Sequence, residues 1–140
     1  MTARLGEQRP TETHEVANDA DVVRVRQAVR TQAVAASLSL IDQTKLVTAT
    51  SELARNTVTY GKGGTAVIEH VTKLNRAGIR VTFTDSGPGI PDLEKALTDG
   101  WTSGTGMGLG LSGARRLVDD FEVTSAPGEG TTVCITKWAR

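Results

Sequence analysis

The spacing of the apolar residues changes near residue 61, and this change limits the folds that the chain can adopt. Two earlier segments, residues 19–36 and 42–60, repeat apolar side chains every three or four positions, which predicts two amphipathic helices. Residues 79–84 instead alternate between apolar and polar side chains, which predicts a half-buried strand. Helices and strands thus form separate groups along the chain. We therefore predict an α+β fold, a two-layer α/β sandwich in which helices cover one face of a mixed sheet.

Capping and turn residues set the expected boundaries of these elements. Asn18, Asp19 and Asp21 are N-cap candidates for the first helix, and Asp42 is the expected cap of the second. The expected buried stripes are Val22, Val25, Val29, Ala33 and Ala36 in the first helix, and Leu46, Ala49, Thr50, Leu53 and Thr57 in the second. The other expected elements are a strand at 11–17, a strand at 65–73 that pairs with 79–84 around LNRAG, helices at 92–98 and 109–120, and a hairpin of 121–126 and 131–138 around PGEG. We expect a loose segment at residues 1–10 and one domain at residues 11–140.

Charge and cysteine content narrow the function classes. Lys plus Arg and Asp plus Glu number 16 each, so nothing in the total charge favours nucleic acid or an anionic membrane as a partner. A neutral total still permits local charged patches. Cys134 is the single cysteine, which excludes an internal disulfide. No apolar run has the length of a membrane span or a signal peptide, so we expect a cytoplasmic domain.

Glu52 and Asn56 stand one helical turn apart in the second predicted helix, within SELARN, so their side chains share a face. An Asn side chain offers a carbonyl oxygen, a hard ligand that suits Mg²⁺. A Glu side chain can orient water near such an ion or accept a proton from an attacking hydroxyl. By itself, the pair is also compatible with an ordinary solvated helix face.

The segment DSGPGIP follows the alternating strand and begins with Asp85. A carboxylate at a strand end is poorly placed unless it accepts hydrogen bonds, and at the base of a pocket it can accept from the exocyclic amine of adenine. Gly87 and Gly89 allow a sharp turn and the close approach of a flat ligand. An ordinary β-turn with the usual Asp, Ser, Gly and Pro residues is the alternative interpretation.

A glycine run, GWTSGTGMGLG, precedes the predicted helix at residues 109–120. Its alternating glycines are Gly104, Gly106, Gly108 and Gly110. Glycines expose backbone N–H groups, and a helix N-terminus attracts phosphate, so the run predicts a phosphate-binding loop. The run lacks the Gly-Lys-Ser/Thr ending of a P-loop, and a flexible surface loop is the alternative.

The order of these segments is more specific than any one of them, and GEGTTV near the end adds Thr131 at the start of a strand. The order resembles the GHKL (Bergerat-fold) ATP-binding superfamily of gyrase, MutL, the heat-shock chaperones and histidine kinases. SELARN, DSGPGIPD, GLGLSGARRLVDDF and GTTVCITKWAR are similar to the branch of bacterial anti-sigma and stressosome switch-protein serine kinases. The resemblance covers nearly the whole chain.

The resemblance implies a role for each matched residue. Asn56 matches the magnesium ligand, Glu52 the catalytic carboxylate and Asp85 the aspartate that binds adenine. Thr131 matches a threonine near the adenine. The remaining matches are glycines: Gly87 and Gly89 beneath the adenine, and Gly106, Gly108 and Gly110 in the phosphate-facing lid, which also contains Gly104. The implied cofactors are ATP and Mg²⁺.

The same resemblance implies a serine/threonine protein kinase of a partner-switching pathway. Its substrate would be a STAS-domain antagonist, and it would activate a PP2C-type phosphatase by binding. An anti-sigma factor that binds a sigma subunit is an open alternative. An ATPase that uses nucleotide only as a conformational clamp is a third, but the transducer domain of such ATPases is missing. A histidine kinase needs a separate phospho-accepting helix, and His14 lies in an expected strand instead.

The sequence assigns no single role to four further side chains. Lys62 could reach phosphates or lie exposed in its loop, and Arg115 and Arg116 could contact a partner or flank a solvated face. Trp101, within the glycine run, could pack the lid or mark a partner contact.

Overall fold

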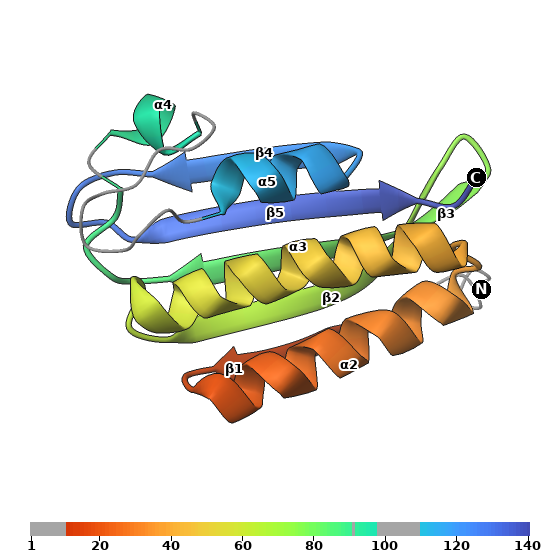
Figure 1. Ribbon diagram of the computed structural model, residues 1–140, viewed down its shortest axis with the longest axis horizontal. Helices are drawn as coiled ribbons and strands as arrows, with labels where there is room; N and C mark the ends of the chain where they lie inside the picture. Colours follow the sequence, from red (N-terminus) through yellow and green to blue (C-terminus); the bar gives the residue numbers. More distant parts are fainter. Residues whose placement is uncertain (1–10, 91, 98–109) are drawn as a thin grey trace, which may run out of the picture.

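A five-stranded sheet with helices packed on one face forms the protein, as the computed structural model shows for residues 11–90, 92–97 and 110–140 (Figure 1). The elements are β1 (Glu12–Val16), α2 (Asp19–Ala35), α3 (Leu40–Thr59), β2 (Gly64–Lys73), β3 (Arg76–Asp85), α4 (Leu93–Ala96), α5 (Leu111–Leu117), β4 (Asp120–Ser125) and β5 (Thr131–Trp138). The predicted α+β class and helix-covered sheet are confirmed. Residues 1–10, expected to be loose, lie outside the described residues, so the domain boundary at residue 11 stays a prediction.

The strand order is β1-β2-β3-β5-β4, and every neighbouring pair is antiparallel. The expectation of a mixed sheet is therefore wrong for the described strands. The helices α2 and α3 run back and forth between β1 and β2, so the chain re-enters the sheet beside its exit point, where Val16 pairs with Gly64. The connection through α5 does make β3 and β4 run in the same direction, but β5 lies between them.

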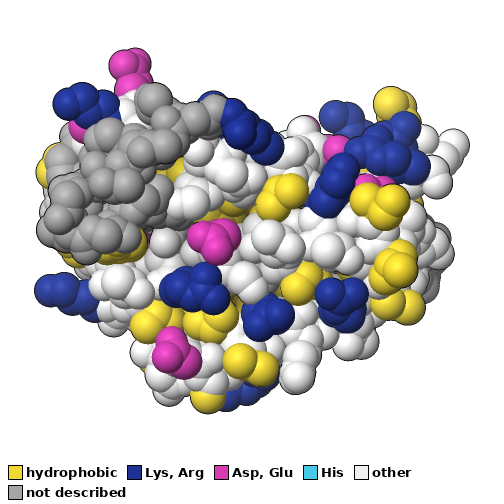
Figure 2. Space-filling model, viewed as in Figure 1, with side chains coloured by type: hydrophobic (Ala, Val, Ile, Leu, Met, Phe, Trp, Pro, Cys, Tyr) yellow, Lys and Arg dark blue, Asp and Glu magenta, His cyan; other side chains and the backbone are white. Residues whose placement is uncertain are grey.

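The core lies between the sheet and its helix layer. Both predicted helical stripes are buried: Val22, Val25, Val29, Ala33 and Ala36 from α2 and its end, and Leu46, Ala49, Thr50, Leu53 and Thr57 from α3. They pack against alternate residues of the central strands, among them Ile79, Val81 and Phe83, which are at most 2% exposed. The outer face of the helices carries many Lys and Arg side chains with apolar ones between them (Figure 2). Within the described residues, no helix is both long enough and apolar enough to cross a membrane.

The helix starts agree with the sequence for α2 and differ for α3. Asn18 caps α2, and its side chain accepts a hydrogen bond from the Asp21 backbone N–H at 2.9 Å. Ser39, not Asp42, caps α3, because the Ser39 hydroxyl accepts from the Asp42 N–H at 3.1 Å. Asp42 instead lies in the first turn with its side chain buried. Both residue types favour N-caps, so the sequence could not decide between them.

The β2–β3 turn and α5 are shorter than predicted. Leu74 and Asn75 alone connect β2 to β3, and both have positive φ angles, 52° and 66°. Helix α5 ends before the extended Val118, because the Asp119 N–H donates to the Thr136 carbonyl of β5 at 2.9 Å and so joins the sheet.

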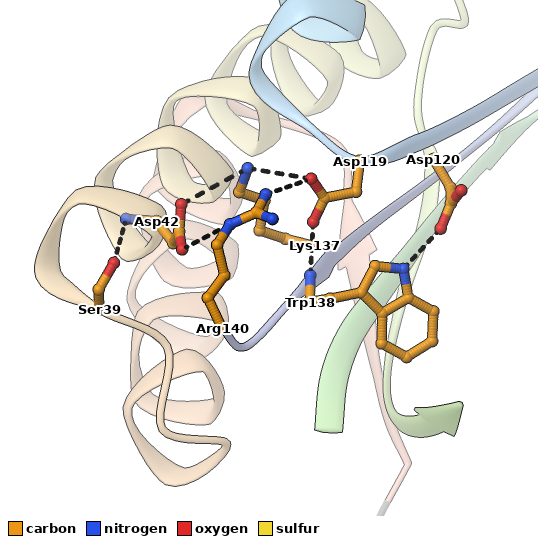
Figure 3. A network of polar contacts seen from close by, with 7 residues as sticks. All are labelled: Ser39, Asp42, Asp119, Asp120, Lys137, Trp138 and Arg140. Carbon is orange, nitrogen blue, oxygen red and sulfur yellow. Dashed lines mark hydrogen bonds and ion pairs between the residues drawn. The ribbon is translucent and has the colours of Figure 1, made fainter. Parts of the chain in front are cut away.

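Four charged side chains form a cluster, here called the C-terminal clamp, that consists of Asp42, Asp119, Lys137 and Arg140 (Figure 3). The ammonium of Lys137 lies 3.5 Å from Asp42 and 3.4 Å from Asp119, and the Lys137 side chain is only 4% exposed. Arg140 contacts both carboxylates, at 3.5 Å and 2.6 Å. The clamp joins the first turn of α3 to the segment after α5 and to the end of β5.

Candidate functional site

A pocket opens between the C-terminal half of α3, the end of β3 and the start of β5. Its lining residues are Leu53, Asn56, Thr57, Tyr60, Gly61, Phe83, Asp85, Gly89, Ile90, Leu111, Thr131 and Val133. Most of these side chains are apolar, and the polar ones come from different elements. An apolar cleft with a few convergent polar groups is the usual form of a small-molecule site.

Four of the residues predicted from sequence line this one pocket: Asn56, Asp85, Gly89 and Thr131. Sheet register explains part of the convergence, because Asp85 at the end of β3 pairs directly with Thr131 at the start of β5. Asn56 is in the last turn of α3, and its backbone carbonyl accepts from the Tyr60 and Gly61 N–H groups, at 2.8 Å and 3.2 Å. The helix therefore ends at the pocket with the Asn56 side chain on its wall.

The carboxylate of Asp85 is held in place by its own turn and by two glycines. The Gly87 backbone N–H donates to Asp85 Oδ1 at 2.9 Å. Gly61 packs so closely on Asp85 that a Cβ atom at residue 61 would overlap the aspartate side chain. A Cβ at Gly87 would lie 2.8 Å from the carbonyl oxygen of Tyr60. The requirement for glycine at position 61 was missed, since the sequence indicated only a helix end there.

The loop after β3 is tied to the β4–β5 turn through Ser125. The Ser125 hydroxyl accepts from the Ile90 N–H at 2.8 Å, donates to the Gly130 carbonyl at 3.1 Å, and contacts Thr131 Oγ1 at 2.8 Å. Gly89 has a φ of +80° and packs against the carbonyl of Ala126, which leaves no room for a side chain. Nothing in the sequence distinguished Ser125 from other serines near turns.

Glu52 lies beside the pocket rather than among its lining residues. Its carboxylate is 3.3 Å from Arg55 Nη1, and its side chain is 44% exposed. A Cβ atom at Gly110 would come within 2.5 Å of Glu52 Oε1. The structure therefore places Glu52 one turn before Asn56, at the point where α5 begins.

The glycine run is described only at its end. Gly110 is the N-cap of α5 with a φ of 63°, and the next residue, Leu111, lines the pocket. Gly104, Gly106, Gly108 and Trp101 lie outside the described residues. Of the other side chains raised by the sequence, Lys62 is exposed and Arg115 donates to the Leu97 carbonyl at 3.5 Å.

The surroundings of the pocket suit a flat ring that donates a hydrogen bond at the end where Asp85 lies. Phe83, Ile90, Leu111 and Val133 supply apolar walls, while Asp85 offers an acceptor at the strand end. Burial raises the pKa of Tyr60, which keeps its hydroxyl neutral. Within the described residues, no cluster of three or more His, Cys, Asp or Glu side chains could hold a metal ion.

Comparison with known proteins gives matches over most of the chain. The sequence model of the histidine kinase-, DNA gyrase B- and HSP90-like ATPase family matches residues 41–139. The serine/threonine-protein kinase RsbT of Bacillus subtilis (strain 168) is 41% identical over 120 residues, which are 86% of this chain and 90% of that protein. An anti-sigma F factor of Thermoanaerobacter sp. (strain X514) is 35% identical over 97 residues, 65% of this chain and 66% of that protein.

A solved structure supports the same fold. The RsbU and RsbW domains of Rv1364c from Mycobacterium tuberculosis align with 94% of this chain at a TM-score of 0.64 and 20% identity. This chain spans 33% of that longer one. The chain belongs to the histidine kinase-, DNA gyrase B- and HSP90-like ATPase family, in the branch that contains RsbT and the anti-sigma F factors.

Proposed function

We propose that this protein is a serine/threonine protein kinase that binds Mg²⁺·ATP in the pocket between α3, β3 and β5. The observation that carries the proposal is the convergence of Asn56, Asp85 and Thr131, from three separate elements, on one apolar pocket with Glu52 at its side. The 41% identity to the serine/threonine-protein kinase RsbT supports the same activity.

The pocket fits the adenine end of the nucleotide. Its apolar walls would contact the two faces of the ring, and the Asp85 carboxylate would accept a hydrogen bond from the exocyclic amine. Because one oxygen of Asp85 already accepts from the Gly87 N–H, the carboxylate orientation is fixed before the ligand arrives. Thr131 adds a hydroxyl beside it, held by Ser125. Gly87 packs against Gly61, and Gly89 packs against Ala126, so neither position has room for a side chain.

The polar end of the pocket fits the metal and the phosphates. Asn56 would supply one oxygen ligand, which suits Mg²⁺ because this ion commonly takes one or two protein ligands together with phosphate oxygens and water. Gly110 would approach the phosphates at the start of α5. The same phosphate-facing role is proposed for Gly104, Gly106 and Gly108, on the basis of the glycine pattern alone.

Glu52 would act on the protein substrate. Bound Mg²⁺·ATP would supply the γ-phosphoryl group and leave as ADP, and the carboxylate of Glu52 would accept the proton from the attacking serine or threonine hydroxyl. Arg55, 3.3 Å away, holds that carboxylate in position on the outer surface of α3. Since Glu52 is partly exposed, a substrate side chain can reach it from solvent.

We further propose a STAS-domain antagonist as the substrate, in a bacterial partner-switching or stress-response pathway. Phosphorylation adds about −1.5 to −2 charge to the substrate interface and thereby releases a bound protein. The freed kinase would then bind and activate a PP2C-type phosphatase. A cytoplasmic location is part of the proposal, because the reaction consumes ATP.

An anti-sigma factor is the second candidate, and it rests on the 35% identity to an anti-sigma F factor. In that case the protein would bind a sigma subunit and phosphorylate a STAS-domain anti-anti-sigma factor. Both candidates use the same nucleotide pocket and differ in the protein that is released.

Calorimetry with Mg²⁺·ATP on the wild type and on Asn56→Ala tests the nucleotide site. We expect a large loss of affinity in the variant, and equal affinities would remove Asn56 from the site. Transfer of radiolabel from ATP to purified STAS proteins tests the kinase activity. Pull-downs with the phosphatase and with sigma factors then separate the two candidates, and a bound sigma factor without labelled STAS protein would favour simple anti-sigma binding.

A further inference from the structure

A hollow of about 340 Å³ lies on the outer side of the helix layer, between α2 and α3. Its lining residues are Val23, Arg26, Gln27, Arg30, Thr31 and Val47. The five residues from α2 recur at intervals of one turn, so they form one continuous face of that helix. Val47 of α3 is only 6% exposed and lies at the other wall. We call this hollow the α2–α3 groove.

The charges of the groove have no counterparts within the described part of the chain. By contrast, Arg24 pairs with Asp21, Arg55 with Glu52 and Arg80 with Glu69. No carboxylate of the described residues lies within ion-pair distance of Arg26 or Arg30. Both are exposed and stand one turn apart, where like charges repel and weaken a helix. A bound anion between them would remove that repulsion.

The groove also exposes apolar surface. Val23, in the second turn of α2, is 48% exposed. An apolar side chain beside two unpaired arginines is the pattern of a surface that binds an amphipathic partner. Figure 2 shows the same combination across the helix-covered face, where Lys and Arg side chains alternate with apolar ones.

We propose that the α2–α3 groove is a protein-docking site for an acidic amphipathic helix of a partner. An amphipathic partner helix carries its anchors at positions i, i+3, i+4 and i+7, so two of its carboxylates one turn apart can reach Arg26 and Arg30, which also stand one turn apart. Partner carboxylates pair with the two guanidinium groups, while an apolar partner side chain covers Val23 and faces Val47. Arginine suits this role because its planar group binds carboxylates in a bidentate manner.

Other occupants fit the observations less well. The two long helices of a second copy offer no such acidic face, because α2 carries only Asp19 and Asp21, while α3 carries the buried Asp42 and one partly exposed carboxylate, Glu52, which pairs with Arg55. The chain as a whole has no net charge, so its long-range attraction to an anionic membrane or nucleic acid is weak. Binding in the groove therefore depends on short-range ion pairs with an acidic partner whose shape fits the groove.

The groove is separate from the nucleotide pocket. Val47 and Asn56 lie on the same helix, nine residues and thus roughly 14 Å apart along its axis. Partner binding in the groove and nucleotide binding in the pocket can therefore be changed independently. The docking proposal also stands apart from the kinase proposal, since it requires no phosphoryl transfer.

The test uses the full-length protein, labelled for NMR, and a synthetic helical peptide with Glu and Leu at i, i+3, i+4 and i+7. A matched peptide has Lys in place of each Glu. We expect the acidic peptide to shift amide resonances of Val23, Gln27 and Thr31, and the basic peptide to leave them unchanged. Equal binding of both peptides, shifts confined to other surfaces, or no binding of the acidic peptide would overturn the proposal.

A pair of charge-reversed variants sharpens the result. Arg26→Glu combined with Arg30→Glu should weaken binding of the acidic peptide by about tenfold or more. The control, Lys73→Glu with Arg76→Glu, changes the net charge equally at exposed positions around the β2–β3 turn and should bind like the wild type. Equal losses in both variants would indicate a general charge effect.

Vesicles that contain phosphatidylserine provide the last comparison, and binding to them instead of the peptide would overturn the docking proposal.

Discussion

Gly110 lies directly against Glu52, so close that a Cβ atom at residue 110 would be 2.5 Å from Glu52 Oε1 and 3.3 Å from Glu52 Cβ. Gly110, the N-cap of α5, thus contacts the carboxylate that we propose as the acceptor of the substrate proton. Gly110 also has a φ of 63°, which residues with a side chain adopt only at a cost of roughly 1–2 kcal/mol. Both features favour glycine at this position.

Gly110→Ala should therefore slow phosphoryl transfer, because the new methyl group displaces the Glu52 carboxylate. We expect a lower rate of radiolabel transfer together with a modest loss of stability. The matched control is Gly113→Ala in the same helix, where a Cβ would meet no atom within 4 Å. That change should leave transfer unaffected and stabilise the protein by about 0.5–1 kcal/mol. Equal transfer rates in both variants would contradict the proposed contact.

Glu52→Gln should separate catalysis from binding. The amide keeps the size of the side chain but cannot accept the proton, so transfer should fall by about 10²–10⁴-fold. Because Glu52 does not line the pocket, Mg²⁺·ATP affinity in calorimetry should stay near the wild-type value. Transfer at the wild-type rate would show that Glu52 is not the base.

Asp85→Asn should show the opposite behaviour. The Asn oxygen can still accept from the Gly87 N–H, so the turn keeps its shape. Its NH₂ group, however, would replace the acceptor that the adenine amine requires. Loss of a hydrogen bond to a charged group costs about 1.5–3 kcal/mol, or roughly 10- to 150-fold in nucleotide affinity. Unchanged affinity, measured by calorimetry, would exclude Asp85 from the adenine site.

Lys137→Met should destabilise the fold far more than Arg140→Ala, although both remove one cation from the C-terminal clamp. Lys137 is buried, and its loss leaves two carboxylates short of a partner, at a cost of about 3–5 kcal/mol. The Arg140 side chain is 55% exposed, so its ion pairs should contribute only about 0–1 kcal/mol. Urea unfolding at constant m-value measures both. Similar midpoints for the two variants would contradict this ranking.

Acid should weaken the clamp through Asp119. Burial tends to raise the pKa of this carboxyl, but the Trp138 N–H, Lys137 and Arg140 outweigh burial and lower the pKa below its ordinary value of 3.8. A carboxyl with a lowered native pKa stabilises the fold above its unfolded pKa, and this stabilisation disappears as the pH falls through the native pKa. The stability difference between wild type and Asp119→Asn should therefore be constant near neutral pH and shrink below about pH 4. Urea midpoints across this range provide the measurement, and a difference that grows with acid would contradict the assignment.

The parts of the fold that depend on local pattern could be predicted from the sequence. The stripe from Leu46 to Thr57 gave α3, and the alternation from Ile79 to Phe83 gave β3, because burial of one face produces these periods directly. Strand directions could not be read in this way. They follow from how many helices separate two strands and from the place of β5 between β3 and β4, which only the folded chain shows.

The candidate site divides in the same way. Asn56 and Asp85 were predicted because each belongs to a short motif with its own chemistry, and Thr131 was predicted through the family resemblance. Ser125 and Gly61 were missed, since their importance comes from contacts with distant segments, the Ile90 N–H and the Asp85 side chain. The sequence did not predict the clamp for the same reason. Asp42 resembles a helix cap, and its ion pair with Lys137 joins two distant segments.

The strand order has a consequence for how the protein is made. The last strand in the sequence, β5, lies inside the sheet between β3 and β4, and it carries Thr131 and Val133 of the pocket. A chain that emerges from the ribosome can pair β1, β2 and β3 early, but the pocket is still open on one side at that stage. The nucleotide that we propose for this pocket would therefore stabilise chains whose synthesis has passed β5 more than shorter ones, because only the longer chains contain Thr131 and Val133.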